Sequence, residues 1–237
     1  MAAPKRFFVE YISEEVLLTG EELRHARSVL RLDAGDEVTL LDGSGVEYSA
    51  VIARSEKASM ILHVTGRRLS DREPKADAYL LIGALKGDKT ELVVQKAVEL
   101  GVNRIGVFSS RYCAAYLNEN KLERLNKVAR EAAKQCMRAV APKVAYYDNF
   151  AAALESADEY KNKLFACEFL PAGSGEIAEG DSYAIVVGSE GGFTEEEYHA
   201  AESLGFCGVS LGKRILRAET AAIALLSVVM YRAGELQ

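Results

Sequence analysis

The stretch that decides the fold is Tyr183-AIVVGSEGGFTEEE, and a second stretch of the same design is Ser210-LGKRILRAETAAIALLSVV. Each combines the pattern of a buried strand, a loop with accessible backbone groups, and a helix. Two such units in succession are typical of α/β proteins that bind a small molecule at the carboxyl ends of parallel strands. We therefore expect the function to reside in these two loops.

Length and composition narrow the class of protein. The 237 residues suffice for one large domain or two smaller ones, and 49% hydrophobic with 27% charged residues is ordinary globular composition. The longest apolar run, Ala221 to Met230, is too short to span a bilayer, and no secretory signal is recognised. The cysteines have neither disulfide nor zinc spacing: Cys113, Cys136, Cys167 and Cys207. We expect a cytoplasmic protein without a metal ion and without membrane contact.

The pattern of hydrophobic residues changes near residue 75. Before it, short alternating segments (37–43, 46–55 and 58–70) predict a small antiparallel β barrel or sandwich, with one helix from Thr19 to Leu30. Residues 71–77 are charged, contain a proline and predict a linker. After it, strands and helices alternate, which predicts a mostly parallel sheet covered on both faces. The expected strands are 78–85, 104–110, 163–170, 183–188 and 208–212, and the expected helices 89–100, 121–138, 195–204 and 218–232.

The glycine-rich loop Gly188-SEGGF separates a strand from a helix whose Thr194 and Glu197 have the spacing of a capping box. Its glycines allow backbone amides to approach a ligand closely, although a tight turn without any ligand is the alternative explanation. No phosphate-binding lysine follows, and Glu190 disfavours a phosphate. The loop therefore favours a neutral or cationic ligand.

The second loop has a different composition. Residues 211–216 offer backbone and apolar groups suited to a flat heterocycle, and Arg217, Glu219 and Thr220 follow just before a very apolar helix. A surface ion pair with Thr220 as a helix cap is the alternative explanation. Polar groups at such a junction favour a binding site.

The net charge of −6 argues against indiscriminate nucleic-acid binding, but basic residues gather in two places. One is Leu23-RHARSVLRL, to which Lys5 and Arg6 add if the N-terminus folds back. The other is the predicted strand-to-helix loop that contains Lys86 and Lys89. A solvated helix surface is the alternative explanation. The candidate RNA-binding residues are Arg6, Arg24, His25, Arg27, Arg31, Lys86 and Lys89.

Seven segments together resemble the 16S rRNA (uracil-N3)-methyltransferase family, of the SPOUT or α/β-knot class. They are Arg6-FF, Leu23-RHARSVLRL, Gly35-DEVTLLDGSG, Lys86-GDKTELVVQKAVELGV, Arg130-EAAKQCMR, Gly188-SEGGFTEEE and Ser210-LGKRILRAETAA. The resemblance implies a PUA-like β barrel for RNA in residues 1–73. It also implies a domain with a deep trefoil knot in residues 74–237, which binds S-adenosylmethionine and forms a homodimer.

The resemblance also assigns residues to the cofactor. This sequence departs from the family's motifs at two positions: Ser189 replaces a common proline, and Met137 replaces a frequent glycine. Leu170 ends the strand that gives the cofactor site a third, apolar wall. The implied cofactor-binding residues are Leu170, Gly188, Ser189, Glu190, Gly191, Gly192, Leu211, Gly212, Ile215, Leu216, Ala218 and Thr220.

The implied reaction is methyl transfer to N3 of a uridine in the RNA of the small ribosomal subunit. N3 carries a proton at neutral pH, so a cation that stabilises negative charge on the uracil carbonyls assists the transfer. Arg217 is the first candidate, Arg138 an alternative, and Glu219 a candidate base. Two rival functions are a SPOUT enzyme that methylates another RNA, for example on a ribose 2′-oxygen, and a non-catalytic RNA-binding protein.

Overall fold

The computed structural model describes residues 5–236, and their contacts divide the chain into two compact units. The first contains the chain up to Glu73 together with residues 130–141, and the second contains residues 74–129 and the chain from Pro142 onward. The sequence had placed residues 130–141 in the second domain, whereas these residues group with the first unit.

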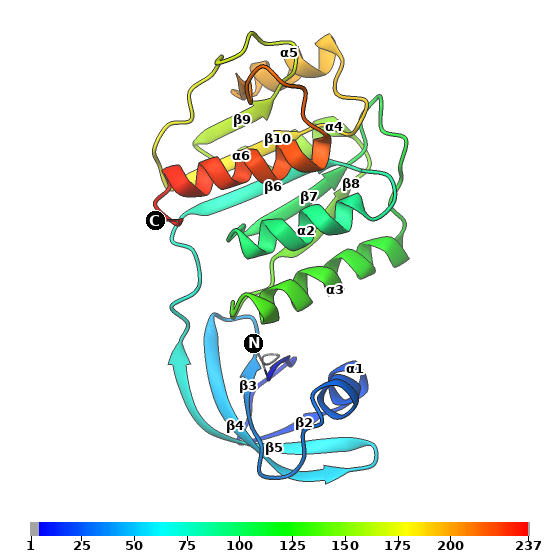
Figure 1. Cartoon of the computed structure of the whole chain (residues 1–237), viewed down its shortest axis with the longest axis vertical. Coiled ribbons are helices and arrows are strands. Elements are labelled where there is room, and N and C mark those ends of the chain that lie inside the picture. The colour runs from blue at the N-terminus through cyan, green and yellow to red at the C-terminus, as the bar shows by residue number, and fades with distance from the viewer. Residues whose placement is uncertain (1–4, 237) are drawn as a thin grey trace. The chain divides into compact units, whose positions relative to one another are not determined.

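The first unit is a curled five-stranded sheet (Figure 1). Its strands follow the order β1-β3-β4-β5-β2, and all neighbours are antiparallel except β1 and β3, which are parallel. This pair departs from the purely antiparallel expectation, because β1 is a short strand that the alternation did not reveal. The bounds are β1 Arg6–Phe8, β2 Glu15–Leu18, β3 Glu37–Leu41, β4 Val46–Glu56 and β5 Ser59–Leu69.

The helix expected at residues 19–30 is confirmed, but in two parts. An α-helical segment, α1 (Gly20–Arg24), continues as a π-helical segment, η1 (His25–Val29). Thr19 lies at the N-cap, yet its side chain makes no capping hydrogen bond. Leu23 and Ala26 are buried among the core residues of the sheet, so packing holds this helix in place.

The second unit contains a six-stranded sheet in which every neighbouring pair is parallel. The α/β class and the parallel sheet are therefore confirmed. The strand order is β11-β9-β10-β6-β7-β8. The strands are β6 Asp77–Gly83, β7 Arg104–Phe108, β8 Lys143–Tyr147, β9 Asn162–Ala166, β10 Ser182–Val187 and β11 Cys207–Val209.

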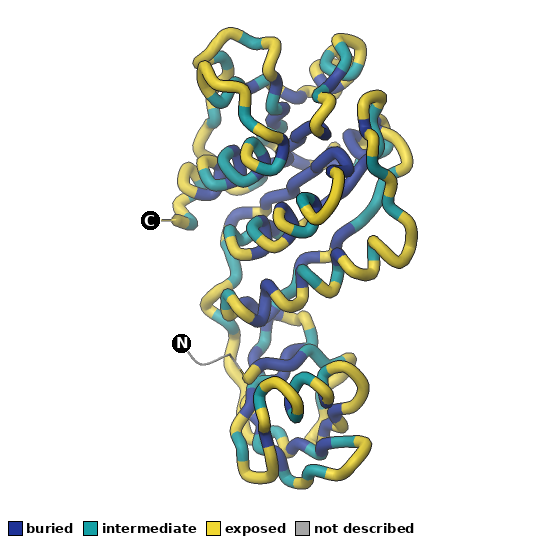
Figure 2. Tube along the Cα trace, turned by 45° about the vertical axis from the view of Figure 1, so that its right-hand side comes forward, coloured by how far each residue is buried: buried dark blue, intermediate teal, exposed yellow. Residues whose placement is uncertain are grey.

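Helices cover both faces of this sheet. Helices α2 (Lys89–Glu99) and α6 (Ala218–Arg232) pack against each other on one face, and α4 (Phe150–Glu155) contacts β7 and β8 on the other (Figure 1). Helix α5 (Glu195–Ser203) contacts α4 and β11. The central strands β6 and β10 are buried almost throughout (Figure 2). Their nearly continuous apolar sequences are typical of strands covered on both sides.

Several elements differ from the sequence expectations. Strand β8 and helix α4 were not predicted, because each is short and follows a proline-containing or polar segment. Helix α3 (Glu119–Gln135) ends earlier than the predicted Arg138, because Met137 has a positive φ of 69°. Helix α3 begins in the second unit and ends in the first.

Candidate active site

The candidate active site is a pocket of about 680 Å³ at the carboxyl ends of β9, β10 and β11. These three strands are neighbours in the sheet, with β9 between the other two, so the loops that follow them meet at one edge. Binding sites of open α/β sheets lie at this edge. The lining comes mostly from residues 166–172, 187–193 and 209–218.

The loop after β10 is held by short-range hydrogen bonds. The N–H of Gly192 donates to the carbonyl of Ser189 at 3.0 Å, and Gly192 has a φ of +67° that favours glycine. The predicted capping box is confirmed: Glu197 N–H donates to Thr194 Oγ1 at 3.1 Å, and Thr194 N–H donates to Glu197 Oε2 at 2.9 Å. The glycine turn therefore runs directly into α5.

Two glycines permit close approaches around this loop. A Cβ atom on Gly83 would lie 2.5 Å from the backbone nitrogen of Ser189, so only glycine lets β6 end against the loop. A Cβ atom on Gly191 would lie 2.5 Å from the Cβ of Tyr112. Gly191 thus packs against the segment after β7 and is not among the residues that line the pocket.

A charged cluster joins the two loops at Lys89, which also lines the pocket. Its Nζ lies 3.1 Å from Glu190 Oε1 and 3.7 Å from Glu219 Oε2. Burial raises the pKa of Glu190, but hydrogen bonds from backbone amides and from Lys89 outweigh it, so that this pKa lies below its ordinary value. Two carboxylates thus neutralise Lys89, which makes it a weak candidate for binding RNA.

The pocket offers an unpaired polar group to a ligand. Ser189 is 5% exposed and lines the pocket, and its buried Oγ has no hydrogen-bond partner among the described residues. An unpaired buried hydroxyl is costly unless a ligand or water pairs with it. The carboxylate of Glu168 also lines the pocket. The Ser189 hydroxyl and the Glu168 carboxylate therefore suit the polar and cationic parts of a ligand.

Most of the residues assigned from the resemblance lie together in the pocket. Arg217 lines it as the exposed N-cap of α6, and its guanidinium has no partner among residues 5–236. Thr220 and Glu219 are outside the lining, like Gly191. The assigned cofactor residues in the lining are Leu170, Gly188, Ser189, Glu190, Gly192, Leu211, Gly212, Ile215, Leu216 and Ala218.

Two candidate residues of the first unit are buried in ion pairs. Arg6 is 3% exposed, and its Nη2 lies 2.9 Å from Glu47 Oε1. Arg138 is likewise 3% exposed and is paired with Glu73. Neither side chain reaches solvent, so the structure gives Arg6 a structural role in place of the expected contact with RNA.

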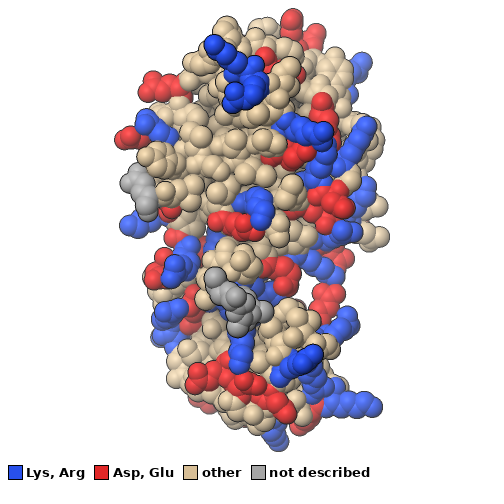
Figure 3. All heavy atoms as spheres, in the orientation of Figure 1, with Lys and Arg blue, Asp and Glu red and all other residues tan. Residues whose placement is uncertain are grey.

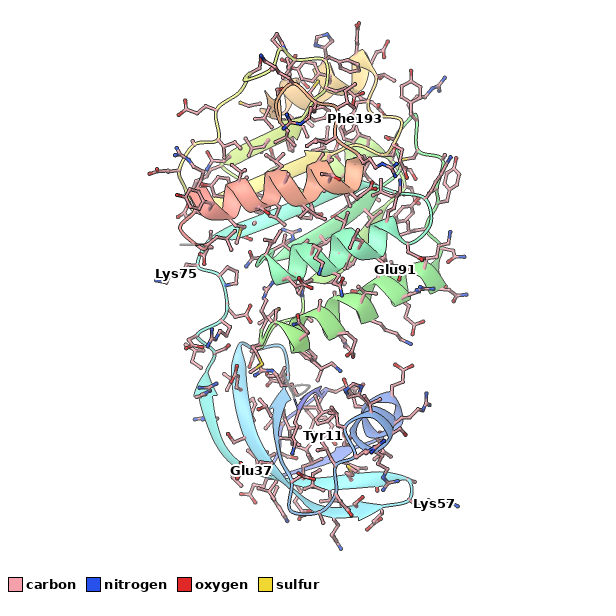
Figure 4. All side chains as sticks on the ribbon, in the orientation of Figure 1. Tyr11, Glu37, Lys57, Lys75, Glu91 and Phe193 are labelled. Carbon is pink, nitrogen blue, oxygen red and sulfur yellow. The ribbon has the colours of Figure 1, made fainter. Side chains whose placement is uncertain are left out.

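The basic segment of η1 also divides into buried and exposed groups. Arg27 donates to the carbonyls of Glu56 and Lys57 in the β4–β5 hairpin, where Figure 4 labels Lys57. The half-buried ring of His25 packs edge-on against Phe7 at 6.3 Å. The exposed candidates are Arg24 and Arg31 in this unit and Lys86 in the second.

Four pocket residues with an exposed charged or aromatic side chain were missed by the sequence reasoning: Glu168, Phe169, Lys213 and Arg214. The first two end the segment that was assigned to a strand, but β9 stops at Ala166 and they belong to the loop. The other two stand inside the quoted loop, which had been interpreted through its backbone alone. The signal was the pair of adjacent cations in a loop without acidic residues.

Two further features, a membrane-spanning helix and a group of metal ligands, are absent from residues 5–236. None of the helices within residues 5–236 has the length and apolar character needed to cross a membrane. Within the same range, no three His, Cys, Asp or Glu side chains are grouped so that they would hold a metal ion.

Comparisons with known proteins identify the class. Residues 72–230 match the RNA methyltransferase domain family, and residues 18–64 match the RNA methyltransferase PUA domain family. The chain is 35% identical to ribosomal RNA small subunit methyltransferase E of Mesomycoplasma hyopneumoniae, over 94% of this chain and 97% of the relative. It is 30% identical to the protein of that name from Bacillus subtilis, over 96% of each.

Two solved structures are similar as well. A putative methyltransferase of Legionella pneumophila, in complex with S-adenosylmethionine, has a TM-score of 0.86 and 28% identity over 96% of this chain and 97% of its own. Ribosomal RNA small subunit methyltransferase E of Neisseria gonorrhoeae, also bound to S-adenosylmethionine, has a TM-score of 0.86 and 29% identity over the same shares. Fold and site thus define an RNA methyltransferase with a PUA domain. More particularly, the chain belongs to the ribosomal RNA small subunit methyltransferase E family.

Proposed function

We propose that this protein uses S-adenosylmethionine to methylate N3 of a uridine in 16S rRNA, within the assembled small ribosomal subunit. The observation that carries the proposal is the pocket at the carboxyl ends of β9, β10 and β11, with an unpaired hydroxyl in its wall and a free arginine beside it. The names of the relatives and the cofactor in two similar structures support it.

The residues of the pocket fit the cofactor chemically. The backbone of residues 211–216 suits the adenine ring, and the buried hydroxyl of Ser189 provides a hydrogen bond to a polar part of the molecule. The exposed carboxylate of Glu168 provides negative potential that favours the cationic part of the ligand. The bound cofactor supplies an electrophilic methyl group, and the protein orients it toward the base.

Arg217 is the proposed catalytic residue. The uracil N3 proton must leave for the methyl group to bond to N3, and loss of the proton places negative charge on the carbonyl oxygens beside N3 until the new N–C bond forms. The exposed guanidinium of Arg217, without a partner among the described residues, is available to stabilise that charge. Glu219 is the proposed acceptor of the proton, although it lies outside the pocket lining; its buried Oε2 has no hydrogen bond within residues 5–236 and is 3.7 Å from Lys89 Nζ. Arg138 stays an alternative to Arg217.

The uridine must be unpaired, because N3 lies on the Watson–Crick edge. The exposed cations of the first unit, Arg24 and Arg31, suit a contact with the RNA backbone, and so does Lys86 in the second. A ribosomal particle that presents one exposed uridine matches this small number of cations. A cytoplasmic location follows from such a substrate.

We also propose that the protein acts as a homodimer. One side of α6 is buried in the second unit, and the opposite side carries exposed or half-exposed Ala221, Ala224, Val228 and Tyr231. This apolar stripe of helical period suits a second copy of the chain. Tyr231→Glu is expected to yield a monomer by light scattering, and an unchanged mass would contradict the proposal.

The decisive experiment incubates the protein with undermethylated small subunits and labelled S-adenosylmethionine, followed by mass spectrometry of the nucleosides. Labelled 3-methyluridine is expected. Another methylated nucleoside would show that the enzyme methylates a different position in RNA. If the folded protein does not detectably bind the cofactor, a non-catalytic RNA-binding role is favoured. Free 16S rRNA in parallel tests the assembled particle as the substrate.

A further inference from the structure

The pocket has a buried floor and an exposed mouth. Val187, Ser189 and Val209 in the floor are 3%, 5% and 2% exposed. At the mouth, Phe169 is 58% exposed and Ile215 is 87% exposed, although both line the same pocket. A cofactor held by the floor and its backbone leaves this mouth for another molecule.

The mouth is also cationic. Lys213 and Arg214 are exposed, line the pocket, and have no salt bridge or side-chain hydrogen bond to any residue in 5–236. In Figure 3, Lys and Arg atoms gather over the loop between β11 and α6 and are bordered mainly by uncharged atoms. Elsewhere in the second unit, cations such as Lys89 and Lys163 are paired with carboxylates. The protein is acidic overall, so unpaired neighbouring cations point to an anionic partner.

An aromatic ring beside unpaired cations is typical of a site that binds single-stranded nucleic acid. Single-stranded nucleic acids bind where bases stack on aromatic rings while cations follow the phosphates. We propose that Phe169, Lys213 and Arg214 form the binding site for the target nucleotide, with the base on the ring of Phe169 and the flanking phosphates on the two cations. The inference rests on the proposed methylation of RNA, and assigns these residues to positioning the substrate.

The first test removes both cations in the double variant Lys213→Ala/Arg214→Ala. We expect KM for undermethylated small subunits to rise by about tenfold, with kcat and S-adenosylmethionine affinity close to those of the unchanged protein. For a uridine-containing single-stranded RNA, the slope of log affinity against log salt should fall by about 1.4, because each lost phosphate contact removes about 0.7.

The matched control is Lys75→Ala/Lys143→Ala. Lys75 precedes β6 and Lys143 begins β8, so both exposed lysines lie at the amino ends of the strands, opposite the pocket. This variant loses the same charge and should keep the RNA affinity. An equal loss in both double variants would reduce the effect to net charge and overturn the proposal. A loss of S-adenosylmethionine affinity in the first variant would instead assign the cations to the cofactor.

The second test addresses the ring. Phe169→Leu keeps an apolar side chain but loses the π-face, so KM should rise by about tenfold, whereas Phe169→Tyr should restore it. Equal KM values for all three proteins would overturn the stacking role. If the unchanged protein methylates no RNA at all, the proposed function fails. If it methylates RNA and these variants do so equally well, only the present inference fails.

Discussion

Nε and Nη2 of Arg138 both lie within hydrogen-bond distance of one oxygen, Oε2 of Glu73, at 3.1 and 3.0 Å. The other oxygen, Oε1, accepts from the backbone N–H groups of Ala139 and Val140 at 2.7 and 3.0 Å. Glu73 therefore holds the segment that follows α3, and does so inside the first unit. Arg138, a candidate catalytic residue, therefore stabilises this turn through its ion pair with Glu73.

Replacing Arg138 with alanine is expected to lower the free energy of unfolding by about 3 kcal/mol, because the carboxylate of Glu73 loses its buried partner. Urea denaturation measures this change. Glu73→Ala should produce a similar loss, which makes it the matched control. If Arg138→Ala leaves stability unchanged while the folded protein loses turnover, the catalytic alternative for Arg138 is favoured.

Met137→Gly is expected to stabilise the protein by about 1 kcal/mol, because Met137 has a left-handed φ of 69°. The N–H groups of Arg138 and Met137 donate to the carbonyls of Ala133 at 2.9 Å and Lys134 at 3.4 Å, the two bonds of a Schellman motif. Glycine is the usual residue at this position. Urea denaturation of Gln135→Gly, inside the helix, should show a loss instead. A lower stability of Met137→Gly would mean that its partly exposed side chain contributes more than the backbone strain costs.

The ion pairs of Glu47 contribute to the fall in the free energy of unfolding at acid pH. Burial alone would raise the pKa of Glu47, but hydrogen bonds from Arg6 and Arg68 hold it below its ordinary value of 4.5. Since the folded state has the lower pKa, the stabilisation is fully present above pH 4.5 and is lost as pH falls through the folded pKa. Glu47→Gln should therefore flatten the decline below about pH 5 in urea denaturation. The exposed Glu37, labelled in Figure 4, supplies the control Glu37→Gln, for which an equal flattening would contradict this assignment.

Short-range chemistry explains which parts could be predicted from sequence. The capping box of Thr194 and Glu197 spans three residues, and the apolar runs of β6 and β10 are continuous, so both were visible in the chain. Strand β1 has three residues and gains its place only by pairing with β3, which no local pattern reveals.

Long-range partners explain why two candidate residues outside the pocket, Arg6 and Arg138, are buried. Arg6 and Glu47 are 41 residues apart, and Arg138 and Glu73 are 65 apart, so the pairing that buries these arginines was invisible in the sequence. Arginines in basic segments were therefore interpreted as surface groups. The resemblance to a family identified the pocket loops, because their residues are contiguous in the chain.

Arg217→Ala is expected to lower kcat by about 10²–10³-fold, the usual cost of losing one group that stabilises developing charge. S-adenosylmethionine affinity, measured by titration calorimetry, should change little, because the exposed guanidinium is separate from the floor of the pocket. Arg217→Lys retains the charge but loses the planar geometry, and should recover only part of the rate. A loss of cofactor affinity that accounts for the whole defect would remove Arg217 from the catalytic role.

Gly191→Ala is expected to weaken S-adenosylmethionine binding, although Gly191 does not line the pocket. The new Cβ would lie 2.5 Å from the Cβ of Tyr112 and 2.9 Å from its carbonyl oxygen, so the glycine loop must shift. Tyr112→Gly removes the closer contact, and the double variant should therefore recover part of the affinity. Gly66→Ala, where the new Cβ meets no atom within 4 Å, is the control that should bind like the unchanged protein. If calorimetry gives equal affinities for Gly191→Ala and Gly66→Ala, the packing of Tyr112 on Gly191 does not set the shape of the cofactor loop.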